Sequence, residues 1–177
     1  CKLYADDLKL YCPIVPTLGF SESLQTSLDN LCDWSLKWQL PINVDKSFFV
    51  TISRNNICNC AHSYRILCSL LTRRFSVDDL GIAYDCNLCF DNYVNNIASS
   101  AKAKVGLLFR SFKTRDPALL KRAYVTYIRP KLEYASNLWN PFHKTTIAVL
   151  ENVQRYFTRR IPSLSICSYE ERLAMLN

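Results

Sequence analysis

Glycine and long apolar runs are scarce in this sequence. Its 177 residues include only 3 Gly, while 49% are hydrophobic and 21% are charged. This composition excludes a collagen-like fibre and argues against a disordered or low-complexity tail. No run of about 18 apolar residues occurs, so the sequence predicts no membrane span. Because no signal peptide is visible, we expect an intracellular protein of the nucleus or cytoplasm that is not secreted.

Cysteine is abundant, but its count of 9 is odd. As a share of the chain, roughly 5%, cysteine falls short of the roughly 8–10% that marks a small disulfide scaffold. In a reducing compartment we expect most of these thiols to behave as small buried hydrophobes. Two close pairs, Cys58 with Cys60 and Cys86 with Cys89, leave a zinc site open as the less favoured alternative. The first spacing is tight for zinc, and the second pair lies in an apolar stretch.

The formal charge of +7 is unevenly distributed. Residues 1–100 carry 8 Lys and Arg against 10 Asp and Glu, whereas residues 101–177 carry 14 against 5. Because phosphate binding needs clustered cations, the second half indicates a polyanionic partner. The sequence begins at Cys1, without Met, inside a strand-like pattern. We therefore expect a fragment of a longer protein.

Apolar residues at a period of two predict strands in the first half, interrupted by one amphipathic helix that Ser21 caps. Gly81 marks a bend or a close backbone approach. The expected elements are a β-hairpin over 1–12, a helix over 21–39, a strand from Lys46 with Phe48, Val50 and Ile52, a loop over 54–63, and extended segments over 64–71 and 77–84. Together they indicate an α+β arrangement.

Helical periodicity begins after Phe90 and continues to the end of the sequence. A first helix carries an apolar stripe, and Asp116-Pro117 starts the next with an N-cap and a proline at its first position. Pro130 kinks or restarts that helix. A further helix over 145–161 directs Ile147, Leu150, Val153, Phe157 and Ile161 inward, and another begins near Ser168. Tyr124, Tyr127, Trp139 and Phe157 have core spacing, so we expect them to pack rather than to stack on bases.

Asp6 and Asp7 lie next to each other at the tip of the expected hairpin. Mg²⁺ takes few protein oxygens and completes its octahedron with water and substrate phosphates, so two rigidly held carboxylates suit it. The alternative is an ordinary turn, in which Asp is a favoured residue.

Tyr4-Ala5-Asp6-Asp7 resembles the motif C hairpin in the palm of reverse transcriptases, and ordered blocks downstream are similar to those of non-LTR, LINE-type, jockey-like retrotransposon enzymes. The block Leu28, Asp29, Leu31, Trp34, Ser35, Trp38, Leu40, Asn43 and Lys46 resembles motif D. Asp79-Leu80-Gly81-Ile82 is similar to the passage from palm to thumb. The last blocks are Tyr127, Arg129-Pro130, Leu132-Glu133-Tyr134-Ala135-Ser136, Trp139 and Pro141, followed by Leu150-Glu151, Val153-Gln154-Arg155, Phe157-Thr158-Arg159.

The resemblance implies the C-terminal part of a polymerase palm, with antiparallel strands plus a helix, over residues 1–89. A helical thumb and downstream region would occupy 90–177. The complete enzyme would use two Mg²⁺ ions and dNTPs to extend a DNA primer on an RNA template. The fingers and a palm strand with a third catalytic Asp would precede Cys1, so we expect residues 1–177 alone to be inactive. The oligomeric state stays open.

The resemblance also implies residue roles. Asp6 and Asp7 would ligate the metal, Lys46 would lie near the nucleotide phosphates, and Leu80 and Gly81 would lie near the primer terminus. The alternatives are an exposed lysine that opens a strand for Lys46, and an ordinary packed strand for Leu80 and Gly81.

Cations on the expected helices would contact phosphates of the template and primer duplex without sequence preference. They are Lys102, Arg110, Lys113, Lys121, Arg122, Arg155, Arg159 and Arg160. The alternative is a solvated helix face. Two further hypotheses are a non-catalytic nucleic-acid-binding remnant of a mobile element and an element-derived fragment without function.

Overall fold

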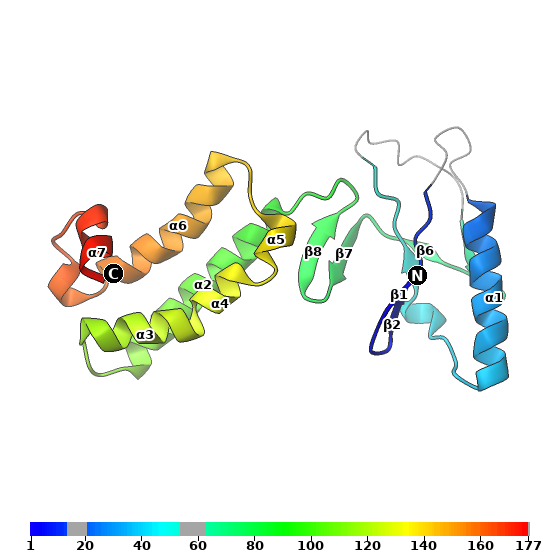
Figure 1. Ribbon diagram of the computed structural model, residues 1–177, viewed down its shortest axis with the longest axis horizontal. Helices are drawn as coiled ribbons and strands as arrows, with labels where there is room; N and C mark the ends of the chain where they lie inside the picture. The colour runs from blue at the N-terminus through cyan, green and yellow to red at the C-terminus, as the bar shows by residue number, and fades with distance from the viewer. Residues whose placement is uncertain (14–20, 54–62, 177) are drawn as a thin grey trace. The chain divides into compact units, whose positions relative to one another are not determined.

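The computed structural model describes residues 1–13, 21–53 and 63–176, and it mixes helices with short strands (Figure 1). The chain forms two compact units, Cys1–Leu88 and Cys89–Asn177. This division lies beside the change of character near residue 90 that the sequence indicates. That the units are a palm and a thumb stays a prediction.

Helix α1 (Glu22–Trp38) supports the first unit. Its N-cap is Ser21, whose hydroxyl accepts a hydrogen bond from the Leu24 amide at 3.3 Å, which satisfies one of the free amides at the helix start. Buried residues of α1 pack against residues in and beside strands β4 to β6, and together they form one small core of Leu28, Cys32, Tyr64, Ile66 and Leu71. The predicted helix and its cap are confirmed.

The strands of the first unit form four two-stranded sheets among the described residues. Three pairs are antiparallel and one, β3 with β6, is parallel. The strands are β1 (Lys2–Tyr4), β2 (Asp7–Lys9), β3 (Phe48–Phe49), β4 (Arg65–Ile66), β5 (Ser69–Leu70), β6 (Thr72–Arg73), β7 (Ser76–Asp79) and β8 (Ile82–Asp85). The resemblance implies antiparallel strands, and the β3–β6 pair departs from that pattern.

Three further strand predictions need correction. The segment 64–71 is not one extended stretch but a hairpin, because Leu67 has a φ of 54° at its turn. The segment 77–84 is likewise a hairpin rather than one stretch, and its turn confirms the predicted bend at Gly81. Strand β3 ends at Phe49, so Val50 and Ile52 follow it outside the ladder. Local alternation gives the extended backbone, but it does not indicate which segments pair.

The second unit is helical. Its elements are α2 (Asp91–Ser111), α3 (Pro117–Tyr127), α4 (Arg129–Glu133), α5 (Ser136–Trp139), α6 (Lys144–Arg159), the 3₁₀ turn η2 (Pro162–Leu164) and α7 (Tyr169–Leu176). Asp116 caps α3 by accepting hydrogen bonds from the amides of Ala118 and Leu119 at 3.3 and 3.1 Å. The chain restarts as α4 at Arg129-Pro130, which confirms the predicted interruption.

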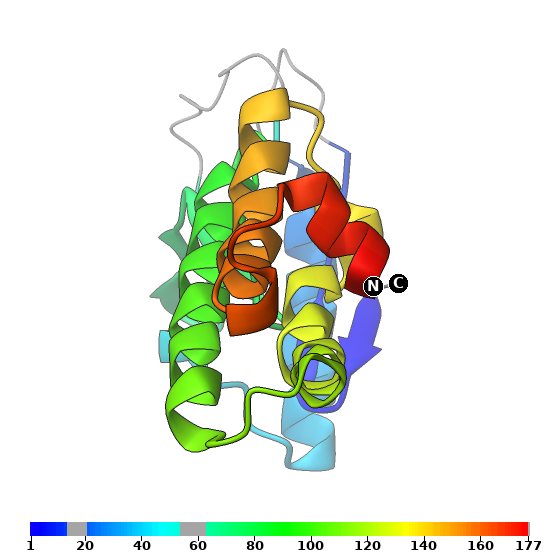
Figure 2. The ribbon, with the colours of Figure 1, turned by 90° about the vertical axis from the view of Figure 1, so that its left-hand side faces the viewer.

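The core of the second unit lies chiefly between α2 and α6, which run side by side (Figure 2). Phe157 is 2% exposed, and its ring lies 4.5 Å from that of Tyr124 and 5.6 Å from that of Phe109. Aromatic pairs at such distances contribute beyond their buried area. Leu120, Ile128, Val153 and Ile161 are fully buried around them.

Several residues that were expected inside are at the surface. Tyr127 is 61% exposed and Ile147 46%. Most described cysteines are not buried either: Cys32 is, whereas Cys1, Cys68 and Cys89 are exposed. Cys58 and Cys60 lie outside the described residues. Among the helices that the structure describes, none is long and apolar enough to cross a membrane.

Candidate active site and nucleic-acid interface

The acidic pair lies on a tight hairpin. Strands β1 and β2 pair with Tyr4 opposite Asp7, so the loop consists of only Ala5 and Asp6. Ala5 adopts a φ of 51°, a left-handed conformation that closes the turn. Asp6 therefore occupies the loop and Asp7 begins the second strand, and both side chains are exposed. The predicted hairpin is confirmed, but its ladder spans residues 2–9 rather than 1–12.

The register decides which side chains share a face of this hairpin. Directly opposed residues of an antiparallel pair lie on the same side of the sheet. Tyr4, Asp7, Lys2 and Lys9 are therefore on one face, and the Leu3–Leu8 pair is on the other. Asp7 therefore shares its face of the hairpin with Lys2 and Lys9.

Two exposed carboxylates suit a hydrated Mg²⁺, which keeps several waters and needs few protein oxygens. Asp6 and Asp7 could hold such an ion. In the described part of the chain, no three Asp, Glu, His or Cys side chains come together as a metal site. Residues 1–176, as far as described, therefore offer two ligands of the expected set and no third carboxylate beside them.

A lysine of the acidic hairpin contacts the turn region of another hairpin. The Lys9 ammonium on β2 donates a hydrogen bond to a carboxylate oxygen of Asp79 at the end of β7 and forms an ion pair with it. This hydrogen bond raises the pKa of Lys9, and the charges of Asp79, Tyr84 and Asp7 act in the same direction, against partial desolvation. The negative charges of Asp79 and Asp7 therefore both act on the Lys9 ammonium.

Leu80 and Gly81 form the two-residue turn between β7 and β8, because Asp79 pairs directly with Ile82. Their φ angles are 51° and 80°. A turn with positive φ at both central positions favours glycine, and a Cβ on Gly81 would meet nothing within 4 Å. Backbone conformation, rather than a close neighbour, therefore accounts for this glycine. Both residues are exposed and lie in a turn, so the interpretation as an ordinary packed strand is wrong.

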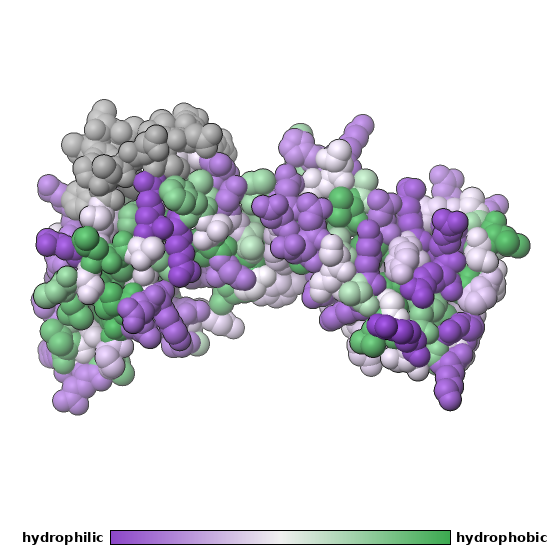
Figure 3. Space-filling model, turned by 180° about the vertical axis from the view of Figure 1, so that it is seen from behind, coloured by the Kyte–Doolittle hydropathy of each residue, from purple (hydrophilic) through white to green (hydrophobic). Residues whose placement is uncertain are grey.

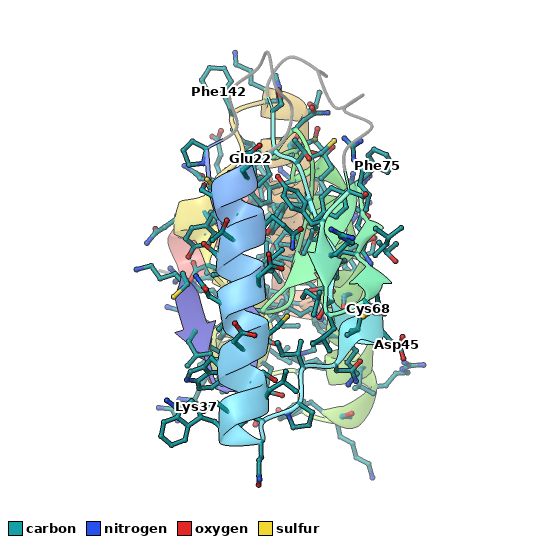
Figure 4. The ribbon with its side chains drawn as sticks, turned by 90° about the vertical axis from the view of Figure 1, so that its right-hand side faces the viewer. Glu22, Lys37, Asp45, Cys68, Phe75 and Phe142 are labelled. Atoms are coloured by element: carbon teal, nitrogen blue, oxygen red, sulfur yellow. The ribbon has the colours of Figure 1, made fainter. Side chains whose placement is uncertain are left out.

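Lys46 ends the 3₁₀ turn η1 (Val44–Lys46), and its amide donates to the Asn43 side chain at 3.1 Å. Its side chain is exposed and precedes β3. Figure 4 places Asp45, its neighbour, on the opposite side of α1 from the β1–β2 hairpin. Among the described residues no hydrogen bond or ion pair joins Lys46 to Asp6 or Asp7. The structure therefore does not bring these predicted catalytic residues together.

Three of the predicted phosphate contacts lie on or directly after α2. Lys102 and Arg110 lie on α2, Lys113 follows its end, and all three are exposed. With 3.6 residues per turn, Arg110 lies on the side of α2 that faces away from the core, whereas Lys102 lies about 80° around the helix from it, beside the buried face. In Figure 3, hydrophilic residues cover much of the helical unit. Lys121 and Arg122 are exposed on α3.

The arginines near the end of α6 differ from one another. The Arg155 guanidinium lies 4.5 Å from the Tyr169 ring centre. The Arg160 guanidinium lies over Phe109 and donates to the Tyr156 hydroxyl at 2.7 Å. Arg159 is exposed, and the described residues provide it with no hydrogen-bond or ion-pair partner. Arg155 and Arg160 therefore have structural contacts that the sequence interpretation did not predict.

A groove of about 760 Å³ opens in the helical unit, lined in part by Tyr124, Trp139, Glu151 and Phe157. Burial, followed by the charge of Glu151, raises the pKa of Tyr124 to about 12. Its hydroxyl has no hydrogen-bond partner among the described residues. The phenol therefore stays protonated at neutral pH.

Sequence reasoning missed Lys9 and Asp79. One signal was present: Lys9 is two residues after Asp7, so strand alternation puts both on one face. The partner, 70 residues away, had no local signal. Arg172, which is buried in α7, was missed for the same reason.

No family model and no solved structure matches the chain. It is 34% identical over 104 residues to an uncharacterized protein of Caenorhabditis elegans, covering 57% of this chain and 52% of that protein. It is 25% identical over 161 residues to the RNA-directed DNA polymerase from mobile element jockey of Drosophila funebris, covering 89% of this chain and 17% of that polymerase. The chain spans only part of each relative. Over most of its length it is distantly similar to a retrotransposon polymerase.

Proposed function

We propose that this chain is a segment of the RNA-directed DNA polymerase of a non-LTR retrotransposon. Residues 1–89 would be part of its palm, and residues 90–177 its helical thumb and downstream region. The observation that carries the proposal is the two-residue hairpin loop that presents Asp6 beside Asp7, both exposed. The similarity to the jockey polymerase supports it.

In the proposed reaction Asp6 and Asp7 would hold Mg²⁺ at the hairpin tip. The bound ions would activate the primer 3′-hydroxyl and stabilise the charge of the leaving pyrophosphate. Leu80 and Gly81 would lie near the primer terminus. Lys46 would lie near the nucleotide phosphates in the complete enzyme.

Primer extension on an RNA template with Mg²⁺ tests this proposal. Residues 1–177 alone should show no extension, because the hairpin supplies two carboxylates and the third would come from another palm strand. In a longer polymerase that contains this segment, Asp6→Asn should abolish extension and leave duplex binding intact. The matched control is Asp33→Asn, an exposed carboxylate of α1, which should retain extension. Extension by the Asp6→Asn variant would remove Asp6 from the site.

The second candidate function is non-catalytic binding of duplex nucleic acid by the helical unit. The exposed cations on and directly after α2 favour it. Binding should weaken linearly in log affinity against log salt concentration. Absence of binding at low salt would instead support a fragment without function.

A further inference from the structure

Few contacts hold the acidic hairpin, formed by β1 and β2, in the first unit. Strands β1 and β2 form a sheet of their own, which no other described strand extends. Residues 1–8 are exposed. An isolated two-stranded hairpin is marginally stable in water, so its orientation needs a further contact.

The Lys9–Asp79 ion pair supplies that contact. Within the described residues it is the one side-chain hydrogen bond or ion pair that residues 1–9 make with another element. The two side chains are 36% and 25% exposed, so water screens the pair only in part. It joins β2, on the face that carries Asp7, to the last residue of β7.

The position of Asp79 determines which part of the first unit the acidic hairpin contacts. Asp79 directly precedes the Leu80–Gly81 turn and pairs with Ile82 across it. The β7–β8 ladder is four residue pairs long and includes the buried Ile82, so this hairpin is the better supported of the two. The Lys9–Asp79 ion pair therefore connects the acidic hairpin to the β7–β8 hairpin directly before the Leu80–Gly81 turn.

We propose that Lys9 and Asp79 are positioning residues that dock the acidic hairpin on the β7–β8 hairpin. The docking orients Asp6 and Asp7 relative to the Leu80–Gly81 turn. Its catalytic consequence rests on the proposed polymerase function, whereas the docking itself does not.

Amide hydrogen exchange of residues 2–9 in the full 177-residue chain tests the docking. Lys9→Met and Asp79→Asn should each speed exchange roughly two- to five-fold, the range for a partly exposed ion pair. The double variant should be no worse than either single variant, and the charge swap Lys9→Asp with Asp79→Lys should restore protection.

Two matched controls are available in the same strands. Lys2 lies directly opposite Lys9 on the same face, and Asp78 precedes Asp79 on β7. Neither has an ion-pair partner among the described residues. Neither Lys2→Met nor Asp78→Asn should speed exchange, and Lys2→Met also removes a like charge opposite Lys9. Unchanged exchange in Lys9→Met, or no recovery in the charge swap, would overturn the docking.

Primer extension by a longer polymerase that contains this segment tests the catalytic consequence. Lys9→Met should lower kcat more than it changes KM for the nucleotide, and the charge swap should recover kcat. Faster exchange with unchanged kcat would overturn the positioning role. If Asp6→Asn retained extension while exchange behaved as expected, the polymerase proposal would fail and the docking would stand.

Discussion

The guanidinium of Arg172 on α7 is buried against Thr158 on α6, with Nε donating to Oγ1 at 3.1 Å. A second donor, Nη1, bonds the carbonyl oxygen of Cys167 at 2.6 Å, and the Tyr169 ring lies 5.6 Å away. Arg172 is 8% exposed and Thr158 2%. No described carboxylate forms an ion pair with this arginine. The buried cation therefore depends on neutral acceptors to connect α7 to α6.

Replacing Arg172 should destabilise the helical unit. Arg172→Met leaves the Thr158 hydroxyl and the Cys167 carbonyl without their donor, which should lower the free energy of unfolding by about 1.5–3 kcal/mol. Arg172→Lys should recover only part of that stability, because an ammonium cannot reproduce the planar fork of donors. Urea denaturation followed by circular dichroism measures the change. Arg159→Met, at an exposed position of α6, is the control and should stay within about 0.5 kcal/mol of the parent.

The cations on and directly after α2 should determine the salt dependence of duplex binding. Replacing Lys102, Arg110 and Lys113 together by Gln removes three proposed phosphate-binding cations. The slope of log affinity against log salt should then become shallower by ~2.7, because each neutralised phosphate accounts for ~0.9 of the slope. Fluorescence anisotropy with a labelled RNA–DNA duplex measures it. An unchanged slope would show that α2 presents a solvated helix face.

Arg155 provides a contrast on α6. Its guanidinium lies against Tyr169, so Arg155→Gln should reduce thermal stability as well as binding. Arg159→Gln should reduce binding alone, because the described residues give that side chain no partner. Equal effects of both variants on stability would contradict the structural role of Arg155. A thermal melt beside each binding titration separates the two effects.

Tyr124→Phe should change the alkaline stability of the helical unit. Because burial raises the pKa of Tyr124 from 10.0 to about 12, its protonated form is favoured in the folded state. This stabilisation is complete below pH 10 and disappears as pH rises from 10 to 12. The variant should therefore be less sensitive to pH over that window. Some sensitivity remains, because burial and the hydrogen bond to Glu151 also raise the pKa of Tyr169.

At neutral pH Tyr124→Phe should leave stability unchanged or slightly higher, because the hydroxyl has no hydrogen-bond partner among the described residues. Thermal melts at about pH 7 and at steps from about pH 10 to 12 measure both effects. The matched control is Tyr127→Phe, an exposed tyrosine of the same helix, which should match the parent at every pH. Strong destabilisation at neutral pH would reveal a partner for the Tyr124 hydroxyl.

Leu80→Asn should stabilise the β7–β8 hairpin. Leu80 adopts a φ of 51°, which Asn tolerates better than Leu, and Asn-Gly is the favoured pair for this turn. Gly81→Ala should instead cost about 1 kcal/mol through its φ of 80° alone, since a Cβ meets no neighbour. Urea denaturation of both variants checks the signs. If Leu80 also lies near the primer terminus, a polymerase carrying Leu80→Asn should be more stable and less active.

The sequence alone determined the local features of this protein. Ser21 caps α1 and Asp116 caps α3 because their oxygens accept from amides two or three residues away. Alternation around Asp6 and Asp7 predicted the acidic hairpin. Interactions of this kind act over a few residues, so the sequence pattern shows them directly.

The tertiary structure decided the contacts between distant segments. Lys9 with Asp79 and Arg172 with Thr158 are separated by 70 and 14 residues, and neither pair has a local signal. Parallel pairing of β3 with β6 and the exposure of Tyr127 likewise depend on which surfaces meet. Because burial and pairing depend on segments brought together in space, composition and periodicity could supply the elements and the acidic tip. They could not predict the contact of Lys9 with Asp79, whose residues are far apart in the sequence.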